Sequence, residues 1–352
     1  MNENKFLLVK GLAGLGNRML SALTAILYSR LTGRRLIIDW SDPTFSKNSS
    51  NSFLEFFLCQ SNGPTDEIPV TDSVNPSVWR HRLSESATSM RTPYKNFTEF
   101  WQNTSIDLKK LDYDEDILIL WLYHEKVTLL RDHFKGAYEE YIRMSNEAIL
   151  TRLLREDLIL HPRIQSKVNE FKHKEFTGKT VGVHIRYTDH RASLLAILDK
   201  LNTLLRLEPG LQVFLATDNI QIKKMFEENY PGVITTPHWY PKPGSRIHNN
   251  LACPDRLESG IESLVDLYLL AECDYLIIDT SSTFSYVAKL LTNAQKSHVF
   301  DVAKVGKLTP GVRQLSWRLM LRLGLYSWGL SSLSKLLRIL KYTKPKKKFN
   351  ID

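Results

Sequence analysis

Short apolar runs alternate with segments of helical length in two stretches of the chain. The first stretch reads as a strand at Phe6–Lys10, a loop at Gly11–Gly16, a helix at Asn17–Thr32 and a strand at Arg35–Trp40. The second stretch opens with a strand-like run at Thr180–Tyr187 and then repeats the pattern. Strands that alternate with helices are typical of parallel sheets with crossover helices, so the sequence predicts an α/β fold.

The same pattern predicts the remaining elements. The other apolar runs expected to form strands are Ile117–Leu122, Gln212–Thr217, Gly232–Thr236, Tyr275–Asp279 and His298–Val302. Helical segments are expected up to Phe171, up to about Glu272 and from Ser282 onward, with a loop at 237–254. Residues 43–110 are polar and rich in Ser, Asn and Pro, which predicts an irregular insertion.

The chain is long enough for two domains. Single cores stop growing near roughly 250–300 residues, and this chain has 352. Since the second stretch begins near Thr177-Gly178, we expect an amino-terminal α/β domain at 1–177, a second α/β domain at 178–302 and a tail at 303–352. Two Rossmann-type halves facing a central cleft make up the GT-B architecture, which this organisation resembles.

Composition indicates a globular protein of a reducing compartment. Apolar residues make up 43% of the chain and aromatic residues 10%, as in globular enzymes. No secretory signal pattern precedes Phe6, and no apolar run reaches the roughly 18 residues of a membrane span. The three cysteines are widely spaced and odd in number. We therefore expect a cytoplasmic location.

The net charge of +9 is concentrated at one end of the chain. Residues 303–352 hold twelve Lys or Arg and one acid, whereas the remaining 35 basic and 37 acidic residues nearly cancel. This distribution argues against nucleic acid as a partner of the main body. Apolar, aromatic and basic residues mix within 314–348, as in an interfacial helix on an anionic membrane surface. Such a tail predicts peripheral attachment to the inner face of the cytoplasmic membrane; a helix packed on the protein's own core is the alternative.

The loop after the first strand contains three glycines. Gly11, Gly14 and Gly16 let the backbone approach a phosphate at a helix start, where unpaired N–H groups favour an anion. Their spacing differs from the G-x-G-x-x-G of dinucleotide folds, although Asp39 ends the second strand, where such folds place a ribose-binding acid. Ligand contact, a structural turn and a dehydrogenase all stay open at this point.

Charged residues end the strand that opens the second stretch. His184, Arg186 and Asp189 lie where side chains of a parallel strand point into the ligand crevice. The guanidinium of Arg186 offers a planar fork of donors that suits two phosphate oxygens. An ordinary surface salt bridge is the alternative, but the position at the strand end favours a functional role.

Hydroxyl residues follow a later strand. Ser281 and Ser282 lie between that strand and a helix, where they either cap the helix or hold a phosphate. Asp266 lies in the preceding amphipathic segment, and its carboxylate either accepts the two N–H donors of a guanine edge or faces solvent.

No pattern typical of a metal site emerges. Asp112-Tyr113-Asp114 imitates the D-x-D metal motif of some glycosyltransferases, but a solvated turn fits its acidic surroundings better. No His or Cys cluster has metal-ligand spacing. We therefore expect neither a metal nor any other cofactor.

Taken together, these segments resemble the NodZ-type nodulation fucosyltransferases and their α-1,6-fucosyltransferase relatives in glycosyltransferase family 23. The α-1,2-fucosyltransferases look like more distant relatives. The similar segments are Gly11–Arg18, Thr32–Trp40, Asn51–Phe57, Val181–Arg186, Val213–Asp218, Ile247-His248 and Val265–Ser282. The likeness spans roughly residues 5–300, and the combination is specific although each piece is not.

The resemblance implies an inverting, metal-independent transfer of fucose from GDP-fucose to a glycan or oligosaccharide acceptor. The acceptor would bind towards the amino-terminal half and the donor in the carboxyl-terminal half. Arg186 would contact the diphosphate, where its charge and backbone N–H groups stabilise the leaving phosphate. The other implied donor-site residues are Ser281 and Ser282 at the phosphate, His184 and Asp266 at the guanine, and Asp218 and His248 lining the site.

Two departures from the family pattern affect the chemistry. Many relatives have a second arginine where this chain has Tyr187. The segment after Asp189 is short and lacks the acid that acts as base in the animal enzymes, so Asp189 and His190 are candidates for the base by position only. A nucleotide-binding oxidoreductase and a non-catalytic carbohydrate- or GDP-binding protein of the same fold are the alternatives to the enzyme.

Overall fold

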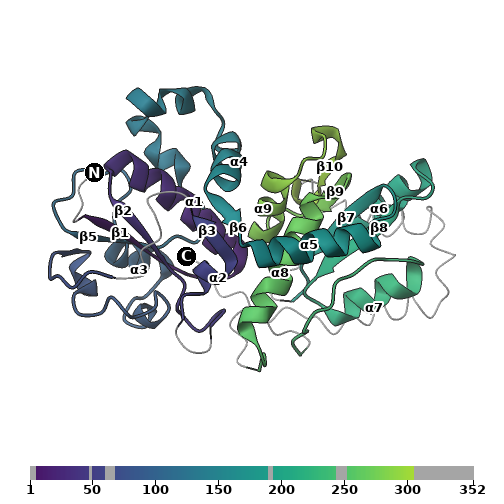
Figure 1. Cartoon of the computed structure of the whole chain (residues 1–352), viewed down its shortest axis with the longest axis horizontal. Helices are drawn as coiled ribbons and strands as arrows, with labels where there is room; N and C mark the ends of the chain where they lie inside the picture. Colours follow the sequence, from purple (N-terminus) through teal and green to yellow (C-terminus); the bar gives the residue numbers. More distant parts are fainter. Residues whose placement is uncertain (1–4, 47–49, 60–67, 189–192, 243–251, 305–352) are drawn as a thin grey trace. The chain divides into compact units, whose positions relative to one another are not determined.

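The computed structural model describes residues 5–46, 50–59, 68–188, 193–242 and 252–304 (Figure 1). The chain divides into two compact units. Unit 1 comprises the residues up to Lys167 together with Pro254–Leu264, and unit 2 comprises Val168–Cys253 and the residues from Val265. Two of the boundaries fall within helices α5 (Pro162–Glu175) and α8 (Arg256–Ala271), and the third lies between Cys253 and Pro254.

Unit 1 is built on a parallel sheet with the strand order β2-β1-β5-β4. Its strands are β1 (Phe6–Lys10), β2 (Arg35–Asp39), β4 (Val74–Asn75) and β5 (Ile117–Leu120). Strands β1 and β5 are buried along their whole length, as is expected of a parallel sheet covered on both faces.

Helix α1 (Leu15–Thr32) is the central helix of unit 1 and packs on β1 and β2. Its first fifteen residues are all buried, and it ends at Gly33, whose φ of 68° is the left-handed conformation that glycine adopts easily. The other elements of this unit are α2 (Ser52–Phe56), α3 (Phe97–Thr104), α4 (Asn146–Glu156), the antiparallel pair β3 (Phe57–Cys59) and β6 (Leu158–Leu160), and 3₁₀ turns at Ser77–Trp79, Ser89–Arg91, Val127–His133 and Gly136–Arg143.

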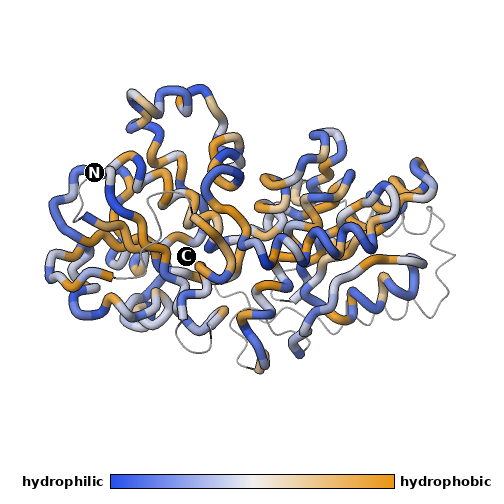
Figure 2. Tube along the Cα trace, in the orientation of Figure 1, coloured by the Kyte–Doolittle hydropathy of each residue, from blue (hydrophilic) through white to orange (hydrophobic). Residues whose placement is uncertain are grey.

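Unit 2 contains a second parallel sheet, with the strand order β10-β9-β7-β8. Its strands are β7 (Thr180–Ile185), β8 (Gln212–Thr217), β9 (Tyr275–Ile278) and β10 (Val299–Asp301). The helices wholly within this unit are α6 (Leu194–Leu207), α7 (Ile220–Asn229) and α9 (Thr283–Leu291), with 3₁₀ turns at Lys296–His298 and Val302–Lys304. Figure 2 shows the strands of both units as predominantly apolar segments.

The predicted α/β class is confirmed, since each unit contains a parallel sheet. Strands β1 and β8 have the predicted bounds, and α1 begins two residues earlier than predicted. The predicted strand at Gly232–Thr236 is wrong: Ile234 makes only an isolated bridge to Phe214. Most of the tail, residues 305–352, lies outside the described residues.

Two stretches were predicted too simply. The helical stretch expected before Phe171 is interrupted by β6, whose Leu158 and Leu160 are buried against β3. The insertion at 43–110 is irregular, as expected, but it contains α2, α3, β3 and β4. Within the described residues, none of the helices has the length and apolar character that crossing a membrane requires.

Helix α8 passes very close to an aromatic cluster of unit 1 at Gly260. A methyl group at this position would lie 2.4 Å from Phe56 Cζ and 3.0 Å from Phe45 Cδ1. We predict that Gly260→Ala lowers the free energy of unfolding by about 1–3 kcal/mol, because overpacking outweighs the helix propensity gain of about 1 kcal/mol. Thermal unfolding followed by circular dichroism measures the loss.

The control is Gly178→Ala, whose new methyl group would meet nothing closer than Gln212 Oε1 at 4.0 Å. This variant is expected to unfold within a degree or two of the parent protein. Equal melting temperatures for the Gly260→Ala variant and the parent would contradict the close packing.

Candidate functional site

The strand order of unit 2 reverses at β7, which places a candidate site at the carboxyl ends of β7 and β9. From β7 the chain continues to β8 on one side, and then returns to β9 on the other. In open α/β sheets ligands bind at such a reversal, outside the carboxyl ends of the strands. The register pairs Val183 with Ile277, so Arg186 and Thr280 follow their strands at the same level.

Asp218 fixes the turn that carries Arg186. Its Oδ1 accepts a hydrogen bond from the backbone N–H of Tyr187 at 2.7 Å, and its Oδ2 accepts one from Thr188 Oγ1 at 2.6 Å. The side chain of Asn219 also donates to the carbonyl of Tyr187, at 3.1 Å. Because both carboxylate oxygens of Asp218 bind the two residues that follow Arg186, this aspartate positions the guanidinium through the backbone.

Tyr187 belongs to the core and not to the surface of the site. It is only 4% exposed and packs in the same apolar cluster as Ile185 and Leu194. The family position that often carries a second arginine is therefore filled here by a core side chain.

His184 connects β7 to the first turn of α9. Its Nδ1 lies 2.6 Å from Ser285 Oγ, and its ring centroid lies 4.8 Å from that of Phe284. Burial, with the nearby charge of Arg186 adding to it, lowers the pKa of His184 to about 3. The imidazole is therefore neutral at physiological pH, so it adds no charge beside Arg186.

The segment between β9 and α9 is held by two aspartates. Asp279 accepts hydrogen bonds from both the N–H and the hydroxyl of Ser281, and Asp301 accepts bonds from the N–H of Thr280 at 3.1 Å and its hydroxyl at 2.5 Å. Ser282 differs from these residues. Its hydroxyl is buried at the start of α9 and has no hydrogen-bond partner among the described residues.

Asp266 is a buried carboxylate of α8. It is 4% exposed, and its oxygens accept hydrogen bonds from Thr236 Oγ1 at 2.6 Å and from His238 Nε2 at 2.7 Å. The solvated position that the sequence left open is therefore wrong. No pattern in the sequence pointed to His238, because this residue lies in an irregular segment far from Asp266 along the chain.

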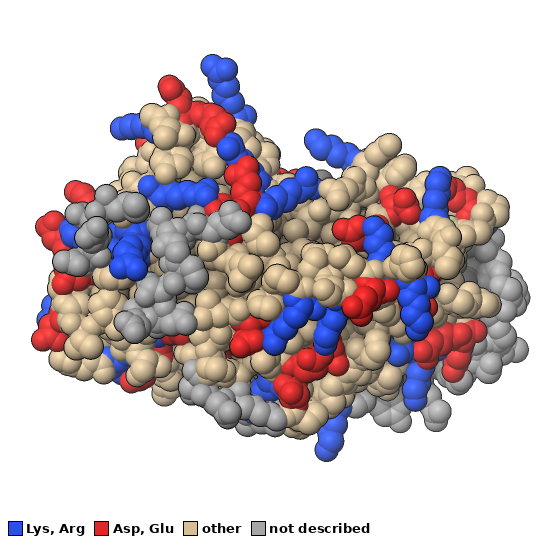
Figure 3. Space-filling model, viewed as in Figure 1, with Lys and Arg blue, Asp and Glu red and all other residues tan. Residues whose placement is uncertain are grey.

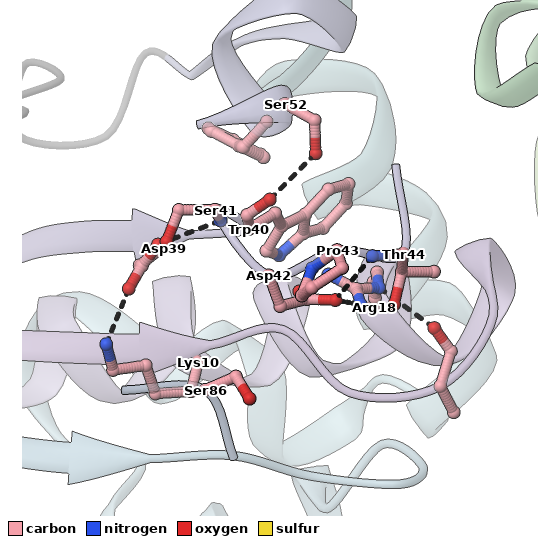
Figure 4. Close-up of polar contacts among 12 residues, drawn as sticks. Lys10, Arg18, Asp39, Trp40, Ser41, Asp42, Pro43, Thr44, Ser52 and Ser86 are labelled. Atoms are coloured by element: carbon pink, nitrogen blue, oxygen red, sulfur yellow. Dashed lines mark hydrogen bonds and ion pairs between the residues drawn. The ribbon is translucent and has the colours of Figure 1, made fainter. Parts of the chain in front are cut away.

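The glycine-containing loop of unit 1 surrounds a buried ion pair (Figure 4). Arg18, which is 1% exposed, donates from Nη1 and Nη2 to the two carboxylate oxygens of Asp42 at 2.7 and 2.8 Å. Its Nε donates to the carbonyl of Ala13 at 2.9 Å. A methyl group on Gly11 would lie 2.0 Å from Arg18 Nη1, so glycine is needed there to leave room for the guanidinium.

This ion pair determines the charge state of Asp42. Burial alone raises the pKa of Asp42, but the charge of Arg18 and hydrogen bonds from Arg18 and Thr44 outweigh burial and hold it below the ordinary value. Gly14 precedes α1 as its N-cap residue, and Gly16 is buried in the first turn. The predicted contact of Gly14 and Gly16 with a ligand stays a prediction.

A second buried ion pair joins the ends of β1 and β2. Lys10 Nζ lies 2.5 Å from Asp39 Oδ2, with side chains that are 2% and 10% exposed (Figure 4). Asp39 Oδ1 also accepts a hydrogen bond from the N–H of Ser41 at 2.9 Å. Asp39, whose position suggested a dehydrogenase, is therefore paired with Lys10. This pairing gives the dehydrogenase interpretation no support.

Three predicted site residues, Asp189, His190 and His248, lie outside the described residues. Asp112 and Asp114 are both exposed, as a solvated turn requires. Within the described ranges, no group of three or more His, Cys, Asp or Glu residues is placed to hold a metal ion. On the face drawn in Figure 3, acidic and basic side chains of the described residues are interspersed.

Residues of types that suit a diphosphate follow β7 and β9. Arg186 comes directly after β7, and the start of α9, with the buried hydroxyl of Ser282, follows β9. The buried polar groups around them, such as His184 and Asp218, form hydrogen bonds within unit 2. These hydrogen bonds hold the turns after β7 and β9 in place.

The chain is similar to known proteins in sequence and in fold. The family model for nodulation protein Z (NodZ) matches residues 143–310. The chain is 23% identical to nodulation protein Z of Azorhizobium caulinodans over 335 residues, which cover 86% of this chain and 93% of the relative. Nodulation protein Z of Bradyrhizobium diazoefficiens is 21% identical over 341 residues, covering 87% of this chain and 84% of the relative.

Solved structures show the same fold. The crystal structure of a NodZ α-1,6-fucosyltransferase co-crystallised with GDP has a TM-score of 0.57 and 22% identity, and it covers 82% of this chain and 93% of its own. The same enzyme soaked with GDP-fucose also gives a TM-score of 0.57. The resemblance to NodZ-type fucosyltransferases that the sequence indicates is therefore confirmed.

The neutral state of His184 predicts a pH dependence of stability. An unfolded chain protonates histidine below about pH 6.5, whereas the folded protein holds the pKa of His184 near about 3. Its contribution is therefore full above pH ~6.5 and is lost progressively as the pH falls towards ~3. We predict that the melting temperature of His184→Gln falls less steeply between pH 7 and 4.5 than that of the parent.

Differential scanning calorimetry in a series of buffers measures this slope. The exposed His173, replaced by Gln, is the matched control and should leave the slope unchanged. If the melting temperatures of the parent and of the His184→Gln variant fall equally steeply with pH, the buried imidazole does not govern the acid sensitivity of the fold.

Proposed function

We propose that this protein is a GDP-fucose-dependent fucosyltransferase that transfers fucose to a hydroxyl group of a glycan or oligosaccharide. The similarity to NodZ extends over most of the chain, and the related enzyme has been crystallised with GDP and soaked with GDP-fucose. The observation that carries the proposal is the carboxyl edge of unit 2, where Arg186 and the start of α9 combine at the reversal of the sheet.

The diphosphate of the donor binds at this edge. Arg186 contacts two phosphate oxygens with its planar fork, and the start of α9 receives the other phosphate through backbone N–H groups and the hydroxyl of Ser282. Ser281 supports this turn through its bonds to Asp279 instead of donating to the ligand. Asp218 keeps the Arg186 turn in place.

The guanine is recognised by Asp266, with His184 nearby as a neutral ring. A carboxylate has about four lone-pair positions, and Thr236 and His238 occupy one on each oxygen of Asp266. Acceptor capacity for the N–H donors of guanine is therefore left. In this proposal His248 also lines the donor site.

The reaction is a single inverting displacement. The acceptor oxygen attacks C1 of fucose from the face opposite the diphosphate, a base takes the proton of the acceptor hydroxyl, and the bond between C1 and the phosphate oxygen breaks. Negative charge grows on the leaving GDP, where Arg186 and the helix start stabilise it. We place the base at Asp189 or His190, which directly follow the Arg186 turn.

Unit 1 holds the acceptor, and the protein works in the cytoplasm. The basic segment at 314–348 attaches it to the anionic inner face of the cytoplasmic membrane, since each basic residue near such a surface adds about 1 kcal/mol. The domain boundaries proposed from the sequence, 1–177, 178–302 and 303–352, describe this division of roles.

Replacement of Arg186 tests the site directly. Arg186→Ala is expected to reduce transfer from GDP-fucose by about a hundredfold or more, the scale of one missing charge-stabilising group. Radiolabelled fucose transfer to an oligosaccharide mixture measures the rate, and thermal shift with GDP monitors binding. Arg206→Ala on the surface of α6 is the matched control and should retain full activity.

Two outcomes would count against the proposal in different ways. Activity of the Arg186→Ala variant within a few-fold of the parent would remove Arg186 from the mechanism. A parent protein that is stabilised by GDP but neither transfers nor hydrolyses GDP-fucose would be a binding protein of the same fold.

Independence from metal ions is the second prediction for the reaction. Arg186 and the start of α9 already supply positive charge at the leaving phosphate, so transfer is expected to keep its full rate in excess EDTA. Initial rates with and without EDTA, and after addition of Mn²⁺ or Mg²⁺, measure this. Loss in EDTA with recovery on adding the metal would instead implicate Asp112 and Asp114.

A further inference from the structure

Two aromatic rings are exposed side by side on unit 1. Phe97 is 38% exposed and Tyr123 is 54% exposed, and their ring centroids lie 5.6 Å apart with an interplanar angle of 80°. The two rings therefore form a right-angled corner on the surface. Tyr123 also carries a hydroxyl group at the tip of its exposed ring.

Buried aromatic residues hold this corner rigidly. The ring of Trp121 lies 5.3 Å from that of Phe97 and stacks on that of Phe100 at 4.4 Å, and both Trp121 and Phe100 are almost fully buried. Trp121 Nε1 donates to Thr104 Oγ1 at 2.9 Å, which ties the end of β5 to α3. A ligand that packs on the corner therefore costs little ordering of the protein.

The corner lies at the ligand-binding edge of the first sheet. Tyr123 follows β5 by three residues, and β5 and β2 flank β1 on opposite sides, so the strand order reverses here as it does at β7. The backbone carbonyl of Tyr123 accepts a hydrogen bond from Asn17 in the first turn of α1. The corner is thus tied directly to the helix that follows the glycine-containing loop.

The chemistry of the two rings suits an uncharged ligand rich in hydroxyl groups. Neither ring carries a charge, and the hydroxyl of Tyr123 is both a donor and an acceptor. A pyranose ring presents C–H bonds on its flat face and hydroxyls at its edge, which match an aromatic ring face and the hydroxyl of Tyr123. A protein partner would need about 800 Å² on each side, far more than two rings provide.

We propose that Phe97 and Tyr123 form a sugar-binding corner that holds one pyranose ring of the acceptor. Tyr123 packs on the flat face of the sugar, Phe97 contacts its edge, and the Tyr123 hydroxyl bonds to a sugar hydroxyl. This inference rests on the proposed function for the identity of the acceptor, but binding of an oligosaccharide to the corner is measurable without any transfer.

Binding is tested first, with chitotetraose and cellotetraose as probes and with GDP both absent and saturating. Saturation-transfer NMR should show transfer from the aromatic signals of the parent to one of these oligosaccharides. Tyr123→Ala is expected to raise the dissociation constant about tenfold, which is about 1.4 kcal/mol, because the flat face of the sugar loses its aromatic partner. Tyr123→Trp should restore it. Ile142→Ala, at another exposed apolar residue of unit 1, is the matched control.

Transfer kinetics provide the second measurement. Phe97→Ala and Tyr123→Ala should raise the KM for the acceptor about tenfold while the KM for GDP-fucose and the GDP-induced thermal shift stay unchanged. The sugar-binding corner would be contradicted if the double variant bound oligosaccharide as tightly as the parent does. It would also be contradicted if the parent bound neither probe, whether GDP is absent or saturating. If the parent binds oligosaccharide but not GDP, the proposed function is contradicted while the proposal of a sugar-binding corner remains supported.

Discussion

Burial of both parallel sheets on their two faces is the constraint on which the rest of the structure depends. Strands β1, β5, β7 and β9 are buried at every residue, so they have no room for chemistry along their length. Polar and charged side chains are confined to the points where these strands end. Parallel strands have their carboxyl ends at the same edge of the sheet. In each unit, polar residues that follow different strands are therefore brought together at that edge, although they lie far apart in the sequence.

The two edges use their polar groups differently. In unit 1 the charges pair with one another: Arg18 with Asp42 and Lys10 with Asp39, each almost fully removed from water. Buried charges of this kind are tolerated only when they are paired, so these four side chains define the loop geometry and are not available to a ligand. In unit 2 the turns are held by Asp218, Asp279 and Asp301, while the hydroxyl of Ser282 stays without a partner among the described residues.

The sequence predicted what depends on local pattern and missed what depends on distant contacts. Apolar runs between breakers located β1 and β8 to the residue, and the positions at strand ends pointed to Arg186. The pairing of Asp266 with His238 and of Arg18 with Asp42 joins residues that carry no mutual signal in one chain. The apolar segment at 232–236 resembled a strand, yet its pairing with β8 is limited to one bridge between Ile234 and Phe214.

The core position of Tyr187 determines how charge is distributed in the site. An arginine there would place a second guanidinium beside Arg186, and burial of His184 as a neutral ring leaves no other cation on β7. In the proposed donor site, further positive charge comes from the start of α9, whose dipole and N–H groups act over one turn of helix. The hydrogen bond between His184 and Ser285 connects that turn to the strand that carries Arg186. A buried, neutral histidine thus connects the two groups that we propose as sources of positive charge at the diphosphate.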